Sequence, residues 1–253
     1  MAGFGALLRK ELLELWRTAR LPVVATVFLL VGLGSPLLAR FTPELLKAVA
    51  GDQIPIQLPT PSAADSVDQL AKNLGQFGGL IAVLLAMGSV ATEKERGTAA
   101  MILSKPAGRG GFLLAKLVAI GTCLAVAVAV ATAGAWFYTL VLFEPLSPLG
   151  VAASAVLQWL LLMALAAVTF LGSVLTRSSL AAAGLGIVAF IVLGILGAFP
   201  TIARFVPTGL SGPARALALG TNGPDPWTPV VATVVLIVAA GLAAWAAFRE
   251  QEL

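Results

Sequence analysis

Residues Leu117 to Phe143 read LVAIGTCLAVAVAVATAGAWFYTLVLF, without one charged residue. About 20 apolar residues are enough for an α-helix to cross the hydrocarbon core of a bilayer. The stretch therefore predicts a transmembrane helix.

Five further stretches have the same character, and each is bounded by charge, proline or both. The six predicted spans cover residues 21–39, 73–92, 117–143, 149–176, 178–200 and 227–248. Hydrophobic residues make up 59% of the chain and charged residues 11%, which is more apolar surface than one soluble core can hide. We predict an all-α integral membrane protein with six transmembrane helices, forming a single domain over residues 1–253. Pro36 is expected to kink or end the first span.

The positions of the basic residues predict the orientation, because short loops rich in Lys and Arg stay on the cytoplasmic side. An arrangement with the N-terminus inside places eleven of the 16 basic residues in the cytoplasm and five outside. The eleven are Arg9, Lys10, Arg17, Arg20, Lys94, Arg96, Lys105, Arg109, Lys116, Arg177 and Arg249. Six spans then return the C-terminus to the cytoplasm. The net charge of +4 thus reflects topology, and we expect no nucleic-acid partner.

Several classes of chemistry are excluded by composition. The chain has no histidine, and its one cysteine, Cys123, lies inside an apolar run. Disulfides, Cys/His zinc sites and His-dependent catalytic triads are therefore excluded. The sequence also lacks the glycine-rich phosphate loop of ATPases. We expect a protein that is not an enzyme and that holds no metal or cofactor of its own.

The segment 4–20 has the pattern of an amphipathic helix. Its apolar positions recur at helical spacing, while its charged residues point elsewhere, which is typical of a helix lying in the membrane interface. The residues of interest in this interfacial helix are Arg9, Lys10, Glu11, Glu14, Trp16 and Arg17. The alternative is that the segment simply extends the first span into the cytosol. Pro22 favours a break between the two.

Two connections on the predicted outer side carry weaker signals. In residues 40–72, Pro43 after Thr42 indicates a helix start and Gly51 its end, while Ser62 and Asp65 predict a capped helix that runs into the second span. Packing over the outer mouth is the expected role of this loop. The connection 200–227 is rich in Pro and Gly yet apolar, which fits a short re-entrant segment or an ordinary surface loop.

The densest charge cluster lies between the second and third spans, in residues 92–116. Its charges alternate in sign from Glu93 to Arg96, Gly97 marks a bend, and a short apolar helix is expected from Thr98 until Pro106 ends it. A charged elbow that joins two membrane helices is suited to contact a soluble protein, because charge pairs set register. The alternative is a solvated loop that only marks topology.

The residues of this elbow resemble the signature of ABC-2 type transporter permeases. The resemblance rests on Glu93-Lys-Glu-Arg-Gly-Thr98, on Leu103, Pro106 and Arg109, and on Leu113-Leu-Ala-Lys116. The N-terminal run Arg9-Lys-Glu-Leu-Leu-Glu14 is similar to the first helix of that family. Two positions depart from the family pattern, with Gly108 where Ser or Thr is common and Ala115 where Gly is common.

The resemblance implies the membrane-spanning half of an ABC transporter in a prokaryotic cell (inner) membrane. Two permease chains would pair as a homo- or heterodimer, and each would dock a separate ATPase that binds ATP and Mg. The residues implied in that coupling are Glu93, Lys94, Glu95, Arg96, Gly97, Thr98, Pro106 and Arg109. The connection 200–227 would form a re-entrant gate.

Three functions remain open at this point. The first is an ATP-driven permease, and specifically an exporter. The second is an ABC-type membrane scaffold that transmits ATPase motion to an extracytoplasmic partner without moving solute. The third, an ion-driven secondary transporter, is disfavoured because the cores of the six predicted spans contain no ionisable residue.

Overall fold

A computed structural model describes residues 3–50, 60–98 and 108–251, and every regular element within these ranges is a helix. Six helical segments are long and apolar enough to cross a membrane, which confirms the predicted six-span, all-α fold. The first half of the chain contains α1 (Phe4–Arg17), α2 (Arg20–Ala50), α3 (Ala63–Asn73), the π-turn η1 (Leu74–Gly78), α4 (Gly79–Met87), α5 (Ala91–Glu95) and α7 (Arg109–Leu142). The second half contains α8 (Pro148–Leu175), α9 (Ser179–Gly197), α10 (Pro200–Ala203), the 3-10 turn η2 (Pro207–Leu210), α11 (Ser211–Leu219) and α12 (Trp227–Glu250).

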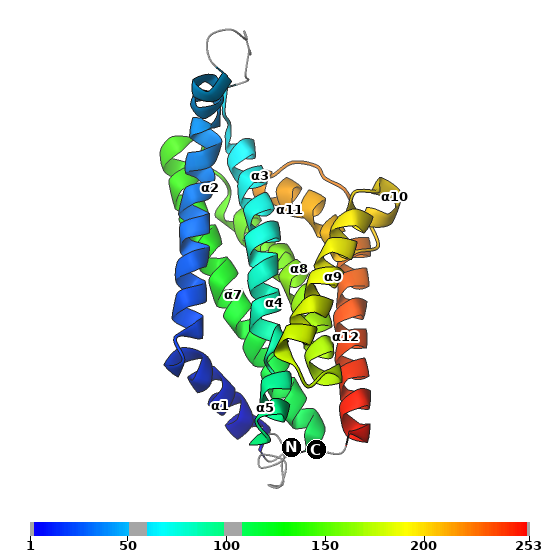
Figure 1. The fold of residues 1–253 in the computed structure, drawn as a ribbon. Helices are drawn as coiled ribbons and strands as arrows, with labels where there is room; N and C mark the ends of the chain where they lie inside the picture. Colours follow the sequence, from blue (N-terminus) through cyan, green and yellow to red (C-terminus); the bar gives the residue numbers. More distant parts are fainter. Residues whose placement is uncertain (1–2, 51–59, 99–107, 252–253) are drawn as a thin grey trace.

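The membrane-spanning helices form one bundle in which α7 and α8 are central (Figure 1). Helix α7 packs along α2 on one side and against α8 on the other, while α8 also contacts α4, α9 and α12. The main core cluster joins residues from several of these helices, among them Phe28, Leu124 and Phe170. Small residues line much of α7 and α8, so that the helix backbones approach closely, as is common between membrane helices.

The first span is longer than predicted, and neither of its inner prolines marks a helix boundary. Helix α2 continues through Pro36 and Pro43, so Pro36 does not end it and Thr42-Pro43 does not start a new helix. Hydroxyl groups support the helix beside both prolines, since Ser35 donates to the carbonyl of Val31 and Thr42 to that of Leu38. Such bonds and packing against a neighbouring helix are what allow proline in membrane helices. The predicted helix end at Gly51 lies outside the described residues.

The second predicted start is confirmed at Ser62. Helix α3 begins at Ala63, and the backbone N–H of Ser62 donates to Asp65 Oδ2 at 2.8 Å. The helical path then runs from Ala63 to Glu95, well beyond the predicted 73–92. The third span is also longer, because α7 begins at Arg109, so the last eight residues of the predicted elbow are already helix.

Helix α1 is separate from the first span, as predicted. It ends at Arg17, and Ala19 adopts a left-handed conformation with φ 56° that turns the chain into α2. Leu15 is buried and Leu12 packs against the main core, while Trp16 is 64% exposed. Figure 1 shows α1 crossing the end of the bundle near both chain termini. The separate helix excludes a simple extension of α2; its place in the membrane interface stays a prediction.

The connection between α9 and α12 is built of short helices that pack on the bundle. Leu210 and Ala214 are buried against Leu157 and Leu160 of α8. These apolar residues of η2 and α11 are therefore covered by protein, at the end of the bundle opposite the termini (Figure 1), whereas α10 has no buried residue. Re-entry into the membrane stays a prediction.

The backbones of α2 and α7 approach each other closely at Gly32. A Cβ atom added to Gly32 would clash with the backbone carbonyl of Ala131, whereas one added to Gly34 would meet nothing within 4 Å. The α2–α7 packing therefore requires glycine at position 32 and does not require it at position 34.

We predict that Gly32→Ala destabilises the protein by about 1–3 kcal/mol, because the added methyl group forces the two helices apart. The measurement is the thermal unfolding midpoint of the purified protein in detergent. Gly34→Ala is the matched control and is expected to leave the midpoint unchanged or slightly raised, since alanine favours helix. Equal midpoints for the two variants would contradict this packing.

Candidate functional site

The candidate site is the end of the bundle where α1, α5 and the start of α7 meet, and it begins with how α5 is held. The backbone N–H groups of Val90 and Ala91 donate to Ser173 Oγ of α8, at 3.1 Å and 2.9 Å. The first N–H groups of a helix have no partner within it, so a hydroxyl from α8 satisfies them here. Gly97, with φ 69°, turns the chain after α5. The start of α5 is thus fixed to the bundle.

A buried ion-pair network lies beside α5. Lys116 Nζ is 2.8 Å from Glu93 Oε1 and 3.1 Å from Glu11 Oε1. The Lys116 side chain is only 4% exposed, and the two carboxylates are 15% and 12% exposed. An unpaired charge at this depth would cost several kcal/mol, so the position of Lys116 requires both partners. One side chain of α7 therefore binds α1 and α5 together.

Lys10 extends the network toward the surface. Its Nζ lies 3.0 Å from Glu11, 3.3 Å from Glu14 and 3.3 Å from Glu93. Burial alone would lower the pKa of Lys10, but the three carboxylates together raise it above its usual value. Lys10 is therefore a permanent cation, and α1 contacts α5 directly as well as through α7.

The three carboxylates raise the question of a metal centre. One oxygen from each of Glu11, Glu14 and Glu93 lies within 4.8 Å of the other two. Lys10 and Lys116 already take the position of a cation among them, at ion-pair distances. We therefore interpret this group as a structural charge network. Within it, Glu93 Oε2 is buried and has no hydrogen-bond partner.

Lys94 points to the opposite side of α5 and contacts the end of α8. Its Nζ donates to the carbonyl of Val174 and, at 3.1 Å, to Gln251 Oε1. Gln251 Nε2 donates to the same Val174 carbonyl at 3.1 Å. The last carbonyls of a helix lack partners within it and carry partial negative charge, so a lysine there is favourable. Lys94 thus joins α5 to α8 and to the C-terminal segment.

Arg109, at the first turn of α7, makes the equivalent contact with α12. Its Nη1 donates to the backbone carbonyls of Arg249 and Phe248. The ring of Phe248 in turn stacks on Phe112 with 5.8 Å between centroids. A basic side chain again satisfies the free carbonyls at a helix end. Through Arg109, the start of α7 and the end of α12 form one unit.

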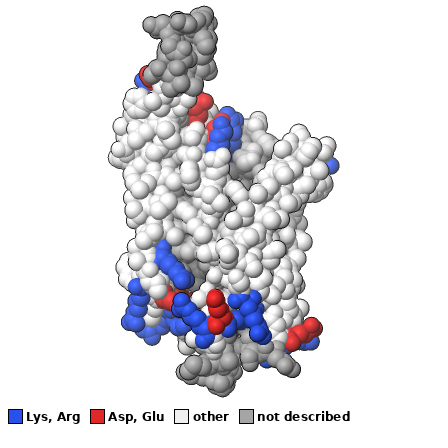
Figure 2. Space-filling view, in the orientation of Figure 1, with Lys and Arg blue, Asp and Glu red and all other residues white. Residues whose placement is uncertain are grey.

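The four described residues that follow Lys94 face solvent. Glu95, Arg96, Gly97 and Thr98 are all exposed, and the Thr98 hydroxyl donates to the Glu93 carbonyl at 3.2 Å. The predicted apolar helix after Thr98 and its end at Pro106 lie outside the described residues. In Figure 2 most of the visible Lys and Arg lie around this end of the molecule, and a smaller group of charged residues lies at the opposite end.

The structure groups the predicted site residues differently from the sequence. The interfacial helix and the elbow were predicted as two separate sets, and the structure joins them through Glu11, Glu93 and Lys116. Arg9, Trp16 and Arg17 are exposed and take no part in the described ion pairs. Sequence reasoning missed Ser173, Phe248 and Gln251. Lys116 offered the one usable signal, because it stands two helical turns into an otherwise apolar helix.

We predict that Lys116→Met destabilises the protein by about 3 kcal/mol, because Glu11 and Glu93 lose the buried cation between them and keep only the half-exposed Lys10 as a partner. The change is measured as the unfolding midpoint in detergent. Lys72→Met, at an exposed lysine of α3, is the matched control and should have no effect. Adding Glu93→Gln to Lys116→Met should restore part of the loss. A double variant no more stable than Lys116→Met would argue against the network.

Comparison with known proteins agrees with the geometry. The ABC-2 family transporter protein family matches residues 6–220. A relative in Bacillus subtilis (strain 168), described as the uncharacterized transmembrane protein YxlG, is 26% identical over 253 residues, which cover 98% of this chain and 97% of the relative. The family match includes α1, α5 and the whole bundle up to the end of α11. The protein is therefore a multi-pass membrane protein that belongs to the ABC-2 transporter family.

Proposed function

We propose that the chain is the permease subunit of an ATP-driven ABC exporter and that it couples to a separate ATPase through residues 92–116. Family membership supports the coarser statement, a membrane subunit of an ABC transporter. The partner ATPase would bind ATP and Mg, and a second permease copy, identical or related, would complete the transporter. The direction, export, follows the family resemblance.

The observation that carries the proposal is the two-sided character of the elbow. Glu93 and Lys94 point inward and bind other helices, whereas Glu95 and Arg96 are exposed in adjacent positions. Exposed opposite charges can set the register of a partner, and the inward pair transfers its displacement to the bundle. A loop that only marked topology would not need inward contacts to α1, α7 and α8.

The contacts define which helices would move. A displacement of α5 acts on α1 and α7 through Glu93 and on the end of α8 through Lys94. Arg109 carries movement of the start of α7 to the end of α12. Because interiors are close-packed, such a displacement would be passed on by helices moving as rigid bodies. We propose this as the route by which ATPase closure reaches the membrane-spanning helices.

The proposed orientation places this end of the bundle in the cytoplasm of a prokaryotic cell, at the inner membrane. Support comes from the distribution of charge, since Lys and Arg gather at the end that carries both termini (Figures 1 and 2). Such enrichment is typical of cytoplasmic loops. An ATPase in the cytoplasm would then meet Glu95 and Arg96 directly.

We predict that the chain co-purifies in stoichiometric amount with an ABC ATPase that is encoded beside it, when the two are co-expressed.

Reversing the exposed pair, with Glu95→Arg and Arg96→Glu together, should lower the ATPase activity of the complex by about tenfold, because two interfacial charges then oppose the partner. Glu144→Lys, an exposed charge reversal at the other end of the bundle, is the control and should leave ATPase activity unchanged.

Two outcomes would separate the alternatives. Normal co-purification and ATPase activity of the reversed variant would remove the elbow from the coupling route. ATP hydrolysis without any ATP-dependent release of lipophilic dyes, peptides or sugars from proteoliposomes would favour the scaffold function, in which ATPase motion acts on an extracytoplasmic partner.

A further inference from the structure

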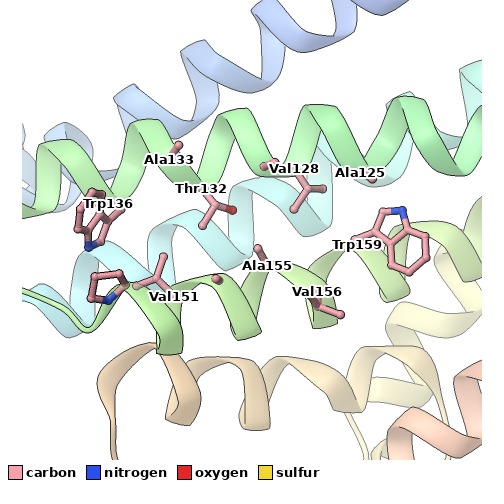
Figure 3. Close-up of a pocket in the computed structure, with 12 residues that line it drawn as sticks. Ala125, Val128, Thr132, Ala133, Trp136, Val151, Ala155, Val156 and Trp159 are labelled. Carbon is pink, nitrogen blue, oxygen red and sulfur yellow. The ribbon is translucent and has the colours of Figure 1, made fainter.

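A pocket of about 500 Å³ lies between α7 and α8, at a distance from the charged end. Its lining is apolar except for one hydroxyl, and Figure 3 shows the side chains of both helices facing a common space. Residues on its rim are exposed on the side of the bundle, among them Ala129, Ala152 and Val156. The pocket therefore opens toward the bilayer.

Tryptophan side chains close both ends of the pocket. The indole N–H of Trp159 donates to the Gly121 carbonyl at 2.9 Å, and that of Trp136 donates to the Leu146 carbonyl at 3.1 Å. Because both N–H groups are already bonded within the protein, the rings offer only apolar surface to an occupant. Trp136 lies near the end of α7, where tryptophan is common at a membrane interface.

The dimensions of the pocket match one leaflet. The lining residues of α7 run from Ala125 to Trp136, which spans about 16 Å along a helix. Half of a hydrocarbon core of about 30 Å is close to this length. A transmembrane helix of a second protein is about twice as long and roughly 10 Å wide, so it would not enter a space bounded by tryptophan at both ends. A single extended alkyl chain fits.

Thr132 is the hydroxyl in the lining, and it has no partner. Its side chain is 5% exposed, and its oxygen is buried without a hydrogen bond. Other buried threonines in these helices behave differently, since Thr139 and Thr169 each donate to the carbonyl four residues earlier. An unmade hydrogen bond of a buried hydroxyl costs about 1–3 kcal/mol. Rotation about Cα–Cβ, for which threonine has two helical rotamers, turns the hydroxyl to the pocket.

We propose that this pocket binds one acyl chain of a phospholipid from the leaflet at the Trp136 end, which is the outer leaflet in the proposed orientation. The first part of the chain, about 10 Å, lies along α7 between Thr132 and the Trp159 end of the pocket, and its ester carbonyl accepts a hydrogen bond from Thr132. Thr132 stands one helical turn, about 6 Å, deeper than Trp136, which is the depth expected for an ester just below the headgroups. The site is independent of the ATPase-coupling proposal.

A neighbouring pocket supplies the internal control. It measures about 590 Å³, shares Ala125 and Trp159 with the first, and extends between α7, α8 and α12. Its threonine, Thr122, already donates to the Val118 carbonyl at 2.8 Å. Thr122 therefore offers the same hydroxyl as Thr132 in a similar apolar lining, but it is exposed and its one donor is already used.

The experiment uses the full chain in detergent and a phosphatidylcholine with a diazirine on its sn-2 chain. Photo-crosslinked peptides are mapped by mass spectrometry while the lipid is titrated. We expect saturable labelling of residues 125–136 and 148–159. Ala152→Leu and, from the facing helix, Ala129→Leu fill the pocket and should abolish this labelling. Ala243→Leu, at an exposed alanine of α12 that lines neither pocket, should leave it unchanged.

The threonine pair tests the hydrogen bond. Thr132→Val should raise the half-saturating lipid concentration roughly threefold to tenfold, the effect of one hydrogen bond, and Thr122→Val should not change it.

Labelling that survives both pocket-filling variants would overturn the lipid site. A shift of those variants from dimer to monomer in native mass spectra would overturn it too, since the groove would then be a subunit interface. An equal effect of the two threonine variants would overturn the role of Thr132.

Discussion

The burial of one charged group, the ammonium of Lys116, is the constraint on which the charged end of this bundle depends. A cation at 4% exposure is stable only beside carboxylates, so α1 must bring Glu11 and α5 must bring Glu93 to the same point on α7. The two acidic groups would repel each other without the lysine between them. Lys116 therefore holds three elements, α1, α5 and α7, in one arrangement, and Lys10 adds a second contact between α1 and α5.

Around that point, basic side chains complete the ends of other helices. Lys94 and Arg109 donate to the free carbonyls at the ends of α8 and α12, while Ser173 of α8 accepts from the first N–H groups of α5. Backbone groups at helix ends need partners when water is scarce. The elbow is thus anchored through its polar groups, and exposed Glu95 and Arg96 project from a firmly held base.

The opposite half of the bundle follows a different rule. There an apolar pocket lies between α7 and α8, with the Thr132 hydroxyl left unpaired, and the one ion pair among the described residues of this half, between Arg215 and Asp68, is 46% and 36% exposed. A buried charge network therefore organises one end of the molecule, and the other end has no such network among its described residues. In the proposed transporter the first end would receive motion from the ATPase, and the second would lie in contact with the membrane.

The sequence by itself determined the six spans and the separate helix α1, because apolar runs of bilayer length and an amphipathic period are local properties. It also indicated the capped start at Ser62. Only the tertiary structure decided that α2 continues through Pro36 and Pro43, since packing and neighbouring hydroxyls outweigh the intrinsic effect of proline. Likewise, the division of the elbow into inward Glu93 and Lys94 and outward Glu95 and Arg96 depends on partners about 80 residues away in α1 and α8. Such long-range contacts leave no periodic pattern in the chain.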